Sequence, residues 1–287
     1  MALVVGSATV ATAMSPIVEA GLYADEIFKD GVTFTSQYDV DAAGQIQVEK
    51  YSPDMEVKAK VPGSNFSDKD YQNTVININC NNAFQYSQKV PAYYEATMPT
   101  SVKMNQTLRT TENVRIGRQK AAIAALVSGG TESANTDAIT AENFKDEFLK
   151  DRKTLVDKFA KPNVAITSTA TYNIMLKLAG TEFTPSTNEN IVTTGQVGYW
   201  MGILWIEAPL LGGATLTYLN ESGTEEVVDT SKVDYILYDY KAFSIIDKLS
   251  MLRVIDSEDF AGSKVQEEID TGFKVTNADC VLVRKNA

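Results

Sequence analysis

The alternation of apolar and polar residues changes character along this 287-residue chain. From Val32 to about Pro99, β-branched and aromatic residues alternate with polar ones, and turn-forming clusters stand at 41–44 and 62–70. A period of two places successive side chains on opposite faces of a strand, so this region is predicted to form strands. Beyond it, apolar residues take helical spacing, and later segments alternate between the two patterns.

The strand signal is clearest in TVININCN, residues 74–81, where Ile76, Ile78 and Cys80 share one face and asparagines share the other. Residues 55–61, MEVKAKV, alternate in the same way and are predicted to be its antiparallel partner, with the polar residues 62–70 between them. A hairpin with so few large apolar residues is marginally stable alone. We therefore expect it to contact something outside its own domain.

Helices are predicted from capping residues and apolar spacing at 16–30, 110–128, 140–159 and 169–179. Thr110 or Thr111 is expected to cap the second helix, Thr140 the third and Ser168 the fourth. In the third helix, Ile139 and Phe144 are placed for a hydrophobic staple. Its apolar stripe is expected to contain Phe144, Phe148, Leu155, Val156 and Phe159.

The segment 193–211, TTGQVGYWMGILWIEAPLL, combines three glycines, two tryptophans and apolar residues at both odd and even positions. This pattern is typical of a strand covered on both faces, and we predict one central strand. Its expected core residues are Gly198, Trp200, Gly202 and Trp205. Residues 163–168 and 233–246 are also predicted to be buried strands, followed by terminal strands at 264–275 and 278–285.

Composition narrows the function. The chain has 26 basic and 37 acidic residues, a net charge of −11, which disfavours binding to nucleic acid by phosphate neutralisation. It has no histidine, which excludes His-dependent triads and nearly every familiar zinc site. Cys80 and Cys280 form no close pair and are expected to be reduced, mostly buried thiols of a cytosolic product.

No apolar run approaches the roughly 20 residues that a membrane helix needs. The first 14 residues lack a basic start, so we expect an N-terminal arm rather than a signal peptide. Gly195, Gly198 and Gly202 do not follow the dinucleotide or P-loop pattern, and no cofactor is expected. Residues 39–44 begin like a calcium loop, but position twelve is Lys50, which favours an acidic turn.

Two weaker signals leave alternatives open. No pair of carboxylates stands out from the many acidic residues, and the aromatic residues could stack on sugars but more often fill cores and interfaces. Arg115, Arg118 and Lys120 belong to the one local basic cluster, which we expect to form ion pairs with acidic neighbours.

The order of these elements resembles the major capsid proteins of tailed bacteriophages, which have the Hong Kong 97-type α+β fold. The resemblance covers essentially the whole chain and is most specific in NVAITSTATYNIMLKL, in the phrase from Gly195 to Ile206, and in VDYILYDYKAFSII. It implies an N-terminal arm at 1–40, and an extended two-stranded loop with flanking peripheral-domain strands at 41–98. It further implies a peripheral domain with a long spine helix at 99–130, an axial domain at 131–257, and terminal strands returning to the peripheral domain at 258–287.

For function, the resemblance implies a non-enzymatic subunit that assembles with itself into pentamers and hexamers of an icosahedral head enclosing double-stranded DNA. It implies a virion component made in the host cytoplasm, with portal and possibly decoration proteins as partners and no membrane. Assembly candidates in the spine helix are Arg115, Arg118 and Lys120. Those in the extended loop are Val57, Lys58, Lys60, Phe66, Lys69 and Tyr71.

The chain is short for that family, which suggests a separate scaffolding protein rather than a built-in scaffolding domain. Some members form a covalent lysine–asparagine cross-link between subunits. Lys58, Lys60 and Lys69 lie in the corresponding region, but neither the partner nor the catalytic glutamate can be matched, so no cross-link is expected.

Two other functions remain open at this point. One is an encapsulin-type nanocompartment shell, which shares the fold. The other, of a different class, is a β-rich carbohydrate-binding or hydrolytic domain, which needs a concave site with aromatic residues and convergent carboxylates.

Overall fold

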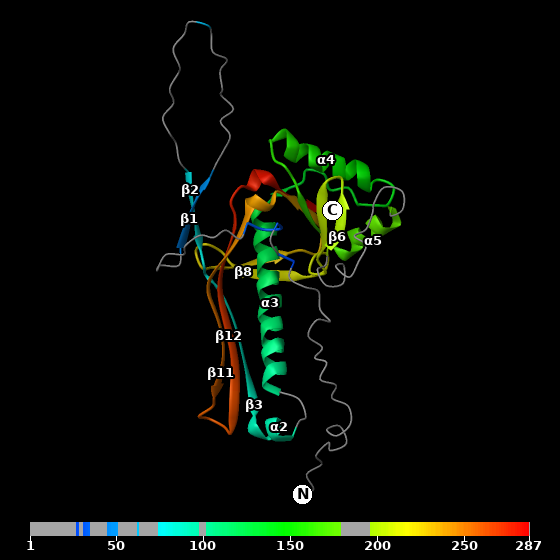
Figure 1. Cartoon of the computed structure of the whole chain (residues 1–287). Coiled ribbons are helices and arrows are strands. Elements are labelled where there is room, and N and C mark those ends of the chain that lie inside the picture. Colours follow the sequence, from blue (N-terminus) through cyan, green and yellow to red (C-terminus); the bar gives the residue numbers. More distant parts are fainter. Residues whose placement is uncertain are drawn as a thin grey trace.

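The computed structural model describes residues 27–28, 31–34, 45–50, 62, 74–97, 102–178 and 196–286, and Figure 1 shows the whole chain. The helices are α2 (Ala92–Thr97), α3 (Val102–Gly129), α4 (Phe144–Asp157) and α5 (Thr169–Leu178). The first strands are β1 (Gln45–Lys50), β2 (Thr74–Asn79), β3 (Asn82–Pro91), β4 (Thr131–Glu132) and β5 (Val164–Thr167). The later ones are β6 (Gln196–Trp200), β7 (Ile203–Glu207), β8 (Thr215–Leu219), β9 (Glu225–Asp229), β10 (Val233–Tyr238), β11 (Phe243–Asp256), β12 (Gly262–Val275) and β13 (Val281–Lys285).

One body of the molecule is the long helix α3 lying against a three-stranded antiparallel sheet in the order β11-β12-β3 (Figure 1). The C-terminal half of α3 is buried from Ala121 to Val127 because alanines and branched residues allow close packing there. At the end of this helix a methyl group on Gly129 would meet Val275 Cγ2 at 2.6 Å. The helix stop therefore coincides with a close approach to β12.

The second body is a six-stranded mixed sheet in the order β4-β13-β10-β5-β7-β6, with α4 and α5 beside it (Figure 1). β5 and β10 lie inside the sheet, and every residue of both is buried. The prediction of a buried strand at 163–168 is confirmed by β5. Of the predicted run 233–246, residues 233–238 form the buried strand β10, whereas a 3₁₀ turn at 240–242 separates it from β11. Ser168 accepts a hydrogen bond from the backbone N of Thr171 at 3.3 Å, which confirms it as the cap of α5.

A short N-terminal segment passes the junction between the two sheets. Phe34 forms a parallel bridge with Ser244, and the Tyr238 hydroxyl donates to the Val32 carbonyl oxygen at 3.0 Å. Phe28 packs on Phe243 with ring centroids 5.6 Å apart. The described part of the expected arm is therefore anchored where β10 gives way to β11.

The strand partner predicted for β2 was wrong. β2 pairs antiparallel with β1, in a register that joins Gln45 to Asn79 and Lys50 to Thr74 and is centred on residue 62, an exposed turn residue. Residues 55–61 themselves lie outside the described residues. Residues 45–50 alternate just as well as 55–61, so the pattern alone could not select between them.

Three helix boundaries also differ from the prediction. α3 begins at Val102, and Thr110 is fully buried within the helix rather than capping it. The strand region predicted to extend to about Pro99 ends earlier, because residues 92–97 form the short helix α2. α4 begins at Phe144 because residues 140–143 form a turn in which Thr140 N donates to Asn143 Oδ1 at 2.7 Å. The helix also ends before Phe159, which has a positive φ of 62° and is 68% exposed.

The predicted single strand at 193–211 is a hairpin of β6 and β7. Met201 and Gly202 form the turn with φ values of 52° and 77°, the positive angles of a two-residue hairpin turn. Gly202 is therefore an exposed turn residue and not part of the core. Gly198 is buried beside a register shift in β6, and Trp200 and Trp205 are 6% and 0% exposed.

The expected boundary at 257/258 does not coincide with a change of sheet. β11, expected in the axial domain, runs antiparallel to β12 in the three-stranded sheet against which α3 lies. β13, expected to return to the peripheral domain, pairs with β10 in the six-stranded sheet instead. The last two strands therefore belong to different bodies, because the 3₁₀ turn at 278–280 lets the chain cross between them.

Candidate functional site

The most elaborate polar cluster is centred on Arg284 of β13, whose side chain is fully buried. Its Nη1 lies 3.5 Å from Oδ2 of Asp151, and its Nη2 lies 3.4 Å from Oε2 of Glu147, both on α4. Nη2 also donates to the carbonyl oxygen of Asp137 at 2.7 Å. We name these three side chains, Arg284, Asp151 and Glu147, the arginine cluster.

Neighbouring groups satisfy the carboxylates of the arginine cluster. The hydroxyls of Tyr235 and Ser133 each donate to Asp151 at 2.6 Å, and the Asn135 amide donates to Glu147. The hydrogen bond from Lys150 lowers the pKa of Glu147, against the opposing effect of burial. Burial raises the pKa of Tyr235 well above its usual range, so this phenol stays protonated and keeps donating.

This cluster binds α4 and the loop at 133–137 to the central sheet. Its carboxylates are closed off by protein groups, so they cannot act as an acid–base pair on an external substrate. Sequence reasoning missed it because the arginine lies 133 residues from Asp151. The one sequence signal was the pair of charged residues, Arg284 and Lys285, that directly follows the apolar residues 281–283.

The aromatic residues of the second body are also directed inward. Trp205 is surrounded by Phe144, Phe148, Trp200 and Tyr235, with ring centroids 5.3 to 5.9 Å away. These rings form a core rather than a sugar-binding platform. Tyr199 is 69% exposed, and Tyr93 and Tyr94 on α2 are 57% and 48% exposed.

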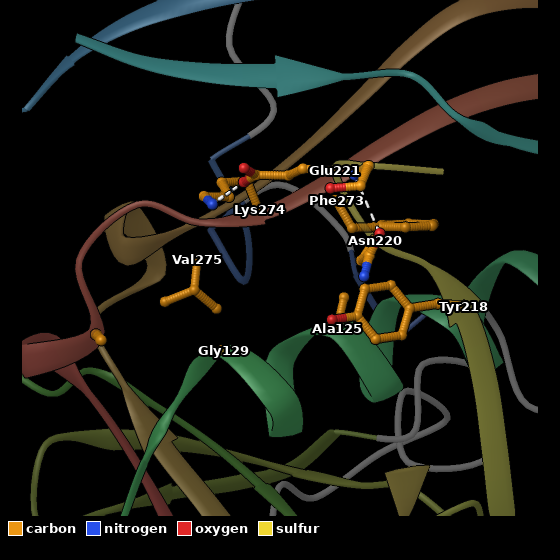
Figure 2. Close-up of a pocket in the computed structure, with 10 residues that line it drawn as sticks. Ala125, Gly129, Tyr218, Asn220, Glu221, Phe273, Lys274 and Val275 are labelled. Atoms are coloured by element: carbon orange, nitrogen blue, oxygen red, sulfur yellow. Dashed lines mark hydrogen bonds and ion pairs between the residues drawn. The ribbon is translucent and has the colours of Figure 1, made fainter. Parts of the chain in front are cut away.

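One pocket of about 480 Å³ lies between the C-terminal part of α3, the turn after β8 and the strand β12 (Figure 2). Figure 2 shows Lys274 and Glu221 at one end, where they form an ion pair, and Tyr218, Phe273 and Val275 along the walls. Burial lowers the pKa of Lys274. The pocket holds one acid and one base already paired with each other, so convergent carboxylates are lacking here.

Among the residues that the structure describes, no group of three or more acidic, cysteine or histidine side chains could hold a metal ion. No helix among those residues is long and apolar enough to span a membrane. Residues 39–44, which the sequence predicts to form an acidic turn, lie outside the described residues.

The basic residues singled out on the long helix take part in ion pairs. Arg115 pairs with Glu112 one turn earlier, and Arg118 Nη2 lies 2.8 Å from Oδ2 of Asp247 on β11. Lys120 is exposed. The expectation of ion pairs with acidic neighbours is therefore confirmed for both arginines, and Arg118 links the helix to the edge of the sheet.

The end strands of the two larger sheets and several apolar side chains remain at the surface of the described residues. Among those residues, β3, β4, β6 and β11 each have one strand neighbour, and Phe34 bridges the outer edge of β11 at Ser244. The candidate residues of the extended loop, between 57 and 71, lie outside the described residues. The exposed apolar residues on helices, strands and turns include Leu149, Val156, Leu176, Tyr199, Met201, Leu252, Val254 and Ile255.

No family model matches the sequence, and the search of curated proteins also gives no match. The chain is similar to solved structures instead. A capsid structure of the cyanophage P-SCSP1u has a TM-score of 0.68 with 8% identity, over 96% of this chain and 91% of that one. A structure from Mycobacterium phage Che8 has a TM-score of 0.62 with 14% identity, over 84% of each chain. A virus-like particle from Pyrococcus furiosus has a TM-score of 0.54 with 11% identity, over 84% and 86%.

The chain has the α+β fold of phage capsid subunits. At these identities the likeness shows the fold, and it extends over nearly the whole chain rather than over a single motif.

Proposed function

We propose that the protein is the major capsid protein of a tailed bacteriophage, with the Hong Kong 97-type arrangement of arm, extended loop, peripheral domain and axial domain. Copies of it assemble into pentamers and hexamers of an icosahedral head around double-stranded DNA. The observation that carries this proposal is the likeness to the P-SCSP1u capsid subunit over 96% of the chain. In this assignment α3 is the spine helix and the six-stranded sheet is the axial domain.

The surface features support a subunit that meets its own copies. Long unpaired strand edges and exposed apolar side chains are liabilities for a free monomer, since they promote association. In a shell the same features are covered by neighbours, and many modest contacts add up because the assembly is multivalent. A projecting hairpin that is weak by itself is stabilised when it lies across an adjacent subunit.

The charge supports a container rather than a DNA-gripping protein. A net charge of −11 gives little sequence-independent attraction to phosphates, so DNA can be packed and released without being bound tightly by the wall. Within this proposal the partners are further copies of the chain, a separate scaffolding protein, a portal and possibly decoration proteins. The protein acts structurally in the virion after synthesis in the host cytoplasm, and carries out no catalysis.

The second candidate is a nanocompartment shell of the encapsulin type, favoured by the likeness to the Pyrococcus furiosus virus-like particle. The TM-score of that likeness is lower, 0.54 against 0.68 for the cyanophage capsid. A carbohydrate-binding or hydrolytic domain has no support in the described residues, whose aromatic cluster is buried and whose pocket lacks convergent carboxylates.

Sedimentation of the purified chain tests the proposal. We expect a population sedimenting as capsomers or closed shells, many times heavier than the 31.4 kDa subunit. A single species of one or two subunits at all concentrations, with and without a co-expressed scaffolding protein, would contradict it.

A further inference from the structure

The base of the β1–β2 hairpin is a sharp change of partner within a nearly continuous strand. β2 ends at Asn79 and β3 begins at Asn82, with two residues between them. β2 pairs with β1 alone, whereas β3 pairs with β12 in the three-stranded sheet. Figure 1 shows the hairpin leaving the end of that sheet at this point. The direction of the hairpin is therefore decided at residues 79–82.

Three asparagine side chains hold this point to the turn between β8 and β9. Asn79 Nδ2 donates to the Glu221 carbonyl oxygen at 3.0 Å. Asn81 Nδ2 donates to the same oxygen at 3.0 Å and to that of Asn220 at 3.2 Å. Asn82 Nδ2 donates to the Leu219 carbonyl oxygen at 2.9 Å, and its Oδ1 accepts from Leu219 N at 2.8 Å.

The turn that receives these asparagines is itself fixed. Asn220 Oδ1 accepts from the backbone N of Ser222 and of Thr224, both at 3.0 Å. Glu221 forms the ion pair with Lys274 of β12 shown in Figure 2. Tyr218 donates to Glu226, which also accepts from Ser128 of α3. The turn is thus tied to both the long helix and the central strand of the sheet.

Beneath the asparagines, β12 passes close to the strand. A methyl group on Gly272 would lie 2.9 Å from the carbonyl oxygen of Asn79 and 3.1 Å from Ile78 Cγ2. The glycine therefore permits the backbones to approach, while the buried Ile78 is a single apolar contact point. Apart from it and the Cys80 thiol, which donates to the Ile246 carbonyl oxygen at 3.7 Å, the fixing contacts of the joint in the described residues run from asparagine side chains to main-chain groups.

We infer that Asn79, Asn81 and Asn82 form a joint that sets the direction of the β1–β2 hairpin and thereby selects which surface of a second copy of this chain the hairpin can reach. This inference rests on the proposed shell function and names the residues that position its hairpin. Neutral side-chain hydrogen bonds to main chain are directional, and those of the partly exposed Asn79 and Asn81 can be lost at small cost. Asn82 is 5% exposed, so its loss leaves the main-chain groups of Leu219 unpaired and costs more. The joint fixes an angle without being needed for folding.

The test replaces all three asparagines by alanine in the full chain, N79A/N81A/N82A. Asn77→Ala is the matched control, since Asn77 lies on the same face of β2 two residues earlier and is exposed. We expect the control to melt close to the unsubstituted chain, and the triple variant to melt a few degrees lower but still in one cooperative transition. We expect the control to form closed shells normally, and the triple variant to give at least about tenfold fewer, with open or irregular forms instead. Normal shells from a correctly folded triple variant would overturn the inference.

A second measurement separates this inference from the proposed function. Spin labels at Q47C and V227C, in a C80S/C280S background, report the distance from the hairpin to β9 in the unassembled subunit. We expect one narrow distance distribution without the alanines and a clearly broader one with them. If the unsubstituted chain forms no shells, the proposed function fails, but the distance distribution still tests whether the three asparagines fix the direction of the hairpin. An unchanged distribution would overturn the joint, whatever the state of assembly.

Discussion

Arg284 and Asp151 lie 3.5 Å apart, and both side chains are almost completely inaccessible, at 0% and 2% exposure. One comes from the last strand and the other from α4, so the pair joins elements separated by 133 residues. Removing one partner of a buried ion pair leaves an uncompensated charge, which usually costs about 3 to 5 kcal/mol.

Arg284→Ala is therefore expected to lower the free energy of unfolding by about 3 to 5 kcal/mol. Asp151 would lose its arginine, and Glu147 would keep only its ion pair with the exposed Lys150. Urea unfolding followed by circular dichroism measures the change. Arg253→Ala is the control, because Arg253 is exposed and contacts Gln266 on the neighbouring strand, and a change within about 0.5 kcal/mol is expected there. Equal stability of both variants would contradict the structural role of the cluster.

The same cluster predicts a dependence on pH. The Lys150 hydrogen bond holds the pKa of Glu147 below its ordinary value of 4.5, so the folded state binds the proton less readily than the unfolded chain. The contribution is present above about pH 4.5 and is lost as the pH falls through the lower folded pKa. The stability difference between the unsubstituted chain and Glu147→Gln should shrink on acidification, as urea titrations from pH 7 to pH 3.5 can show.

The control for that titration is Glu258→Gln, an exposed substitution between β11 and β12 that removes the same charge. A difference for Glu147→Gln that stays constant, or grows, as the pH falls would mean that its carboxylate is not stabilised in the folded state.

Trp205→Ala is expected to cost about 3 to 5 kcal/mol by leaving a cavity in the aromatic core. The indole is fully buried, and its nearest ring centroid, that of Phe148, lies 5.3 Å away. Thermal and urea unfolding measure the loss. Tyr199→Ala, on the adjacent strand and 69% exposed, should change stability by no more than about 0.5 kcal/mol. A Trp205→Ala variant with unchanged stability would show that this residue does not hold the core.

The sequence pattern predicted the buried strands well because a strand buried on both faces has apolar residues at successive positions. Residues 233–238 are apolar at nearly every position, and the structure buries all of them. The turn of the hairpin at 196–207 had no comparable signal in the sequence. Met201 adopts a positive φ, which is rare for a residue other than glycine, so nothing local separated one long strand from two short ones.

Long-range choices were harder. Two segments alternated equally well as partners for β2, and only the pairing with Gln45–Lys50 is seen in the structure. The start of α3 was placed at Thr110 because threonine is a capping residue type, although Thr110 packs inside the helix and Ser101, another capping type, stands directly before Val102. Neither the arginine cluster nor the asparagine joint could be predicted, since both depend on contacts between residues more than 130 positions apart. The run NCNN at the end of β2 was the one local signal for the joint.

Shortening the hairpin tests its assigned role. Lys50 and Thr74 are register partners, so replacing residues 51–73 by Asn-Gly closes the hairpin with a two-residue turn. Because the core of both bodies lies elsewhere, we expect a melting temperature within a few degrees of the full chain. We also expect assembly to be lost in sedimentation. Shells of normal size from the shortened chain would refute a bridging role for this hairpin.

Electron microscopy of the purified, assembled protein tests most directly the proposal that copies of this chain build a closed shell. We expect hollow icosahedral particles in which pentamers and hexamers are visible, with the β1–β2 hairpin of each subunit lying on its neighbour. A field of small discrete particles of one or two subunits, under conditions where the protein is folded, would contradict it.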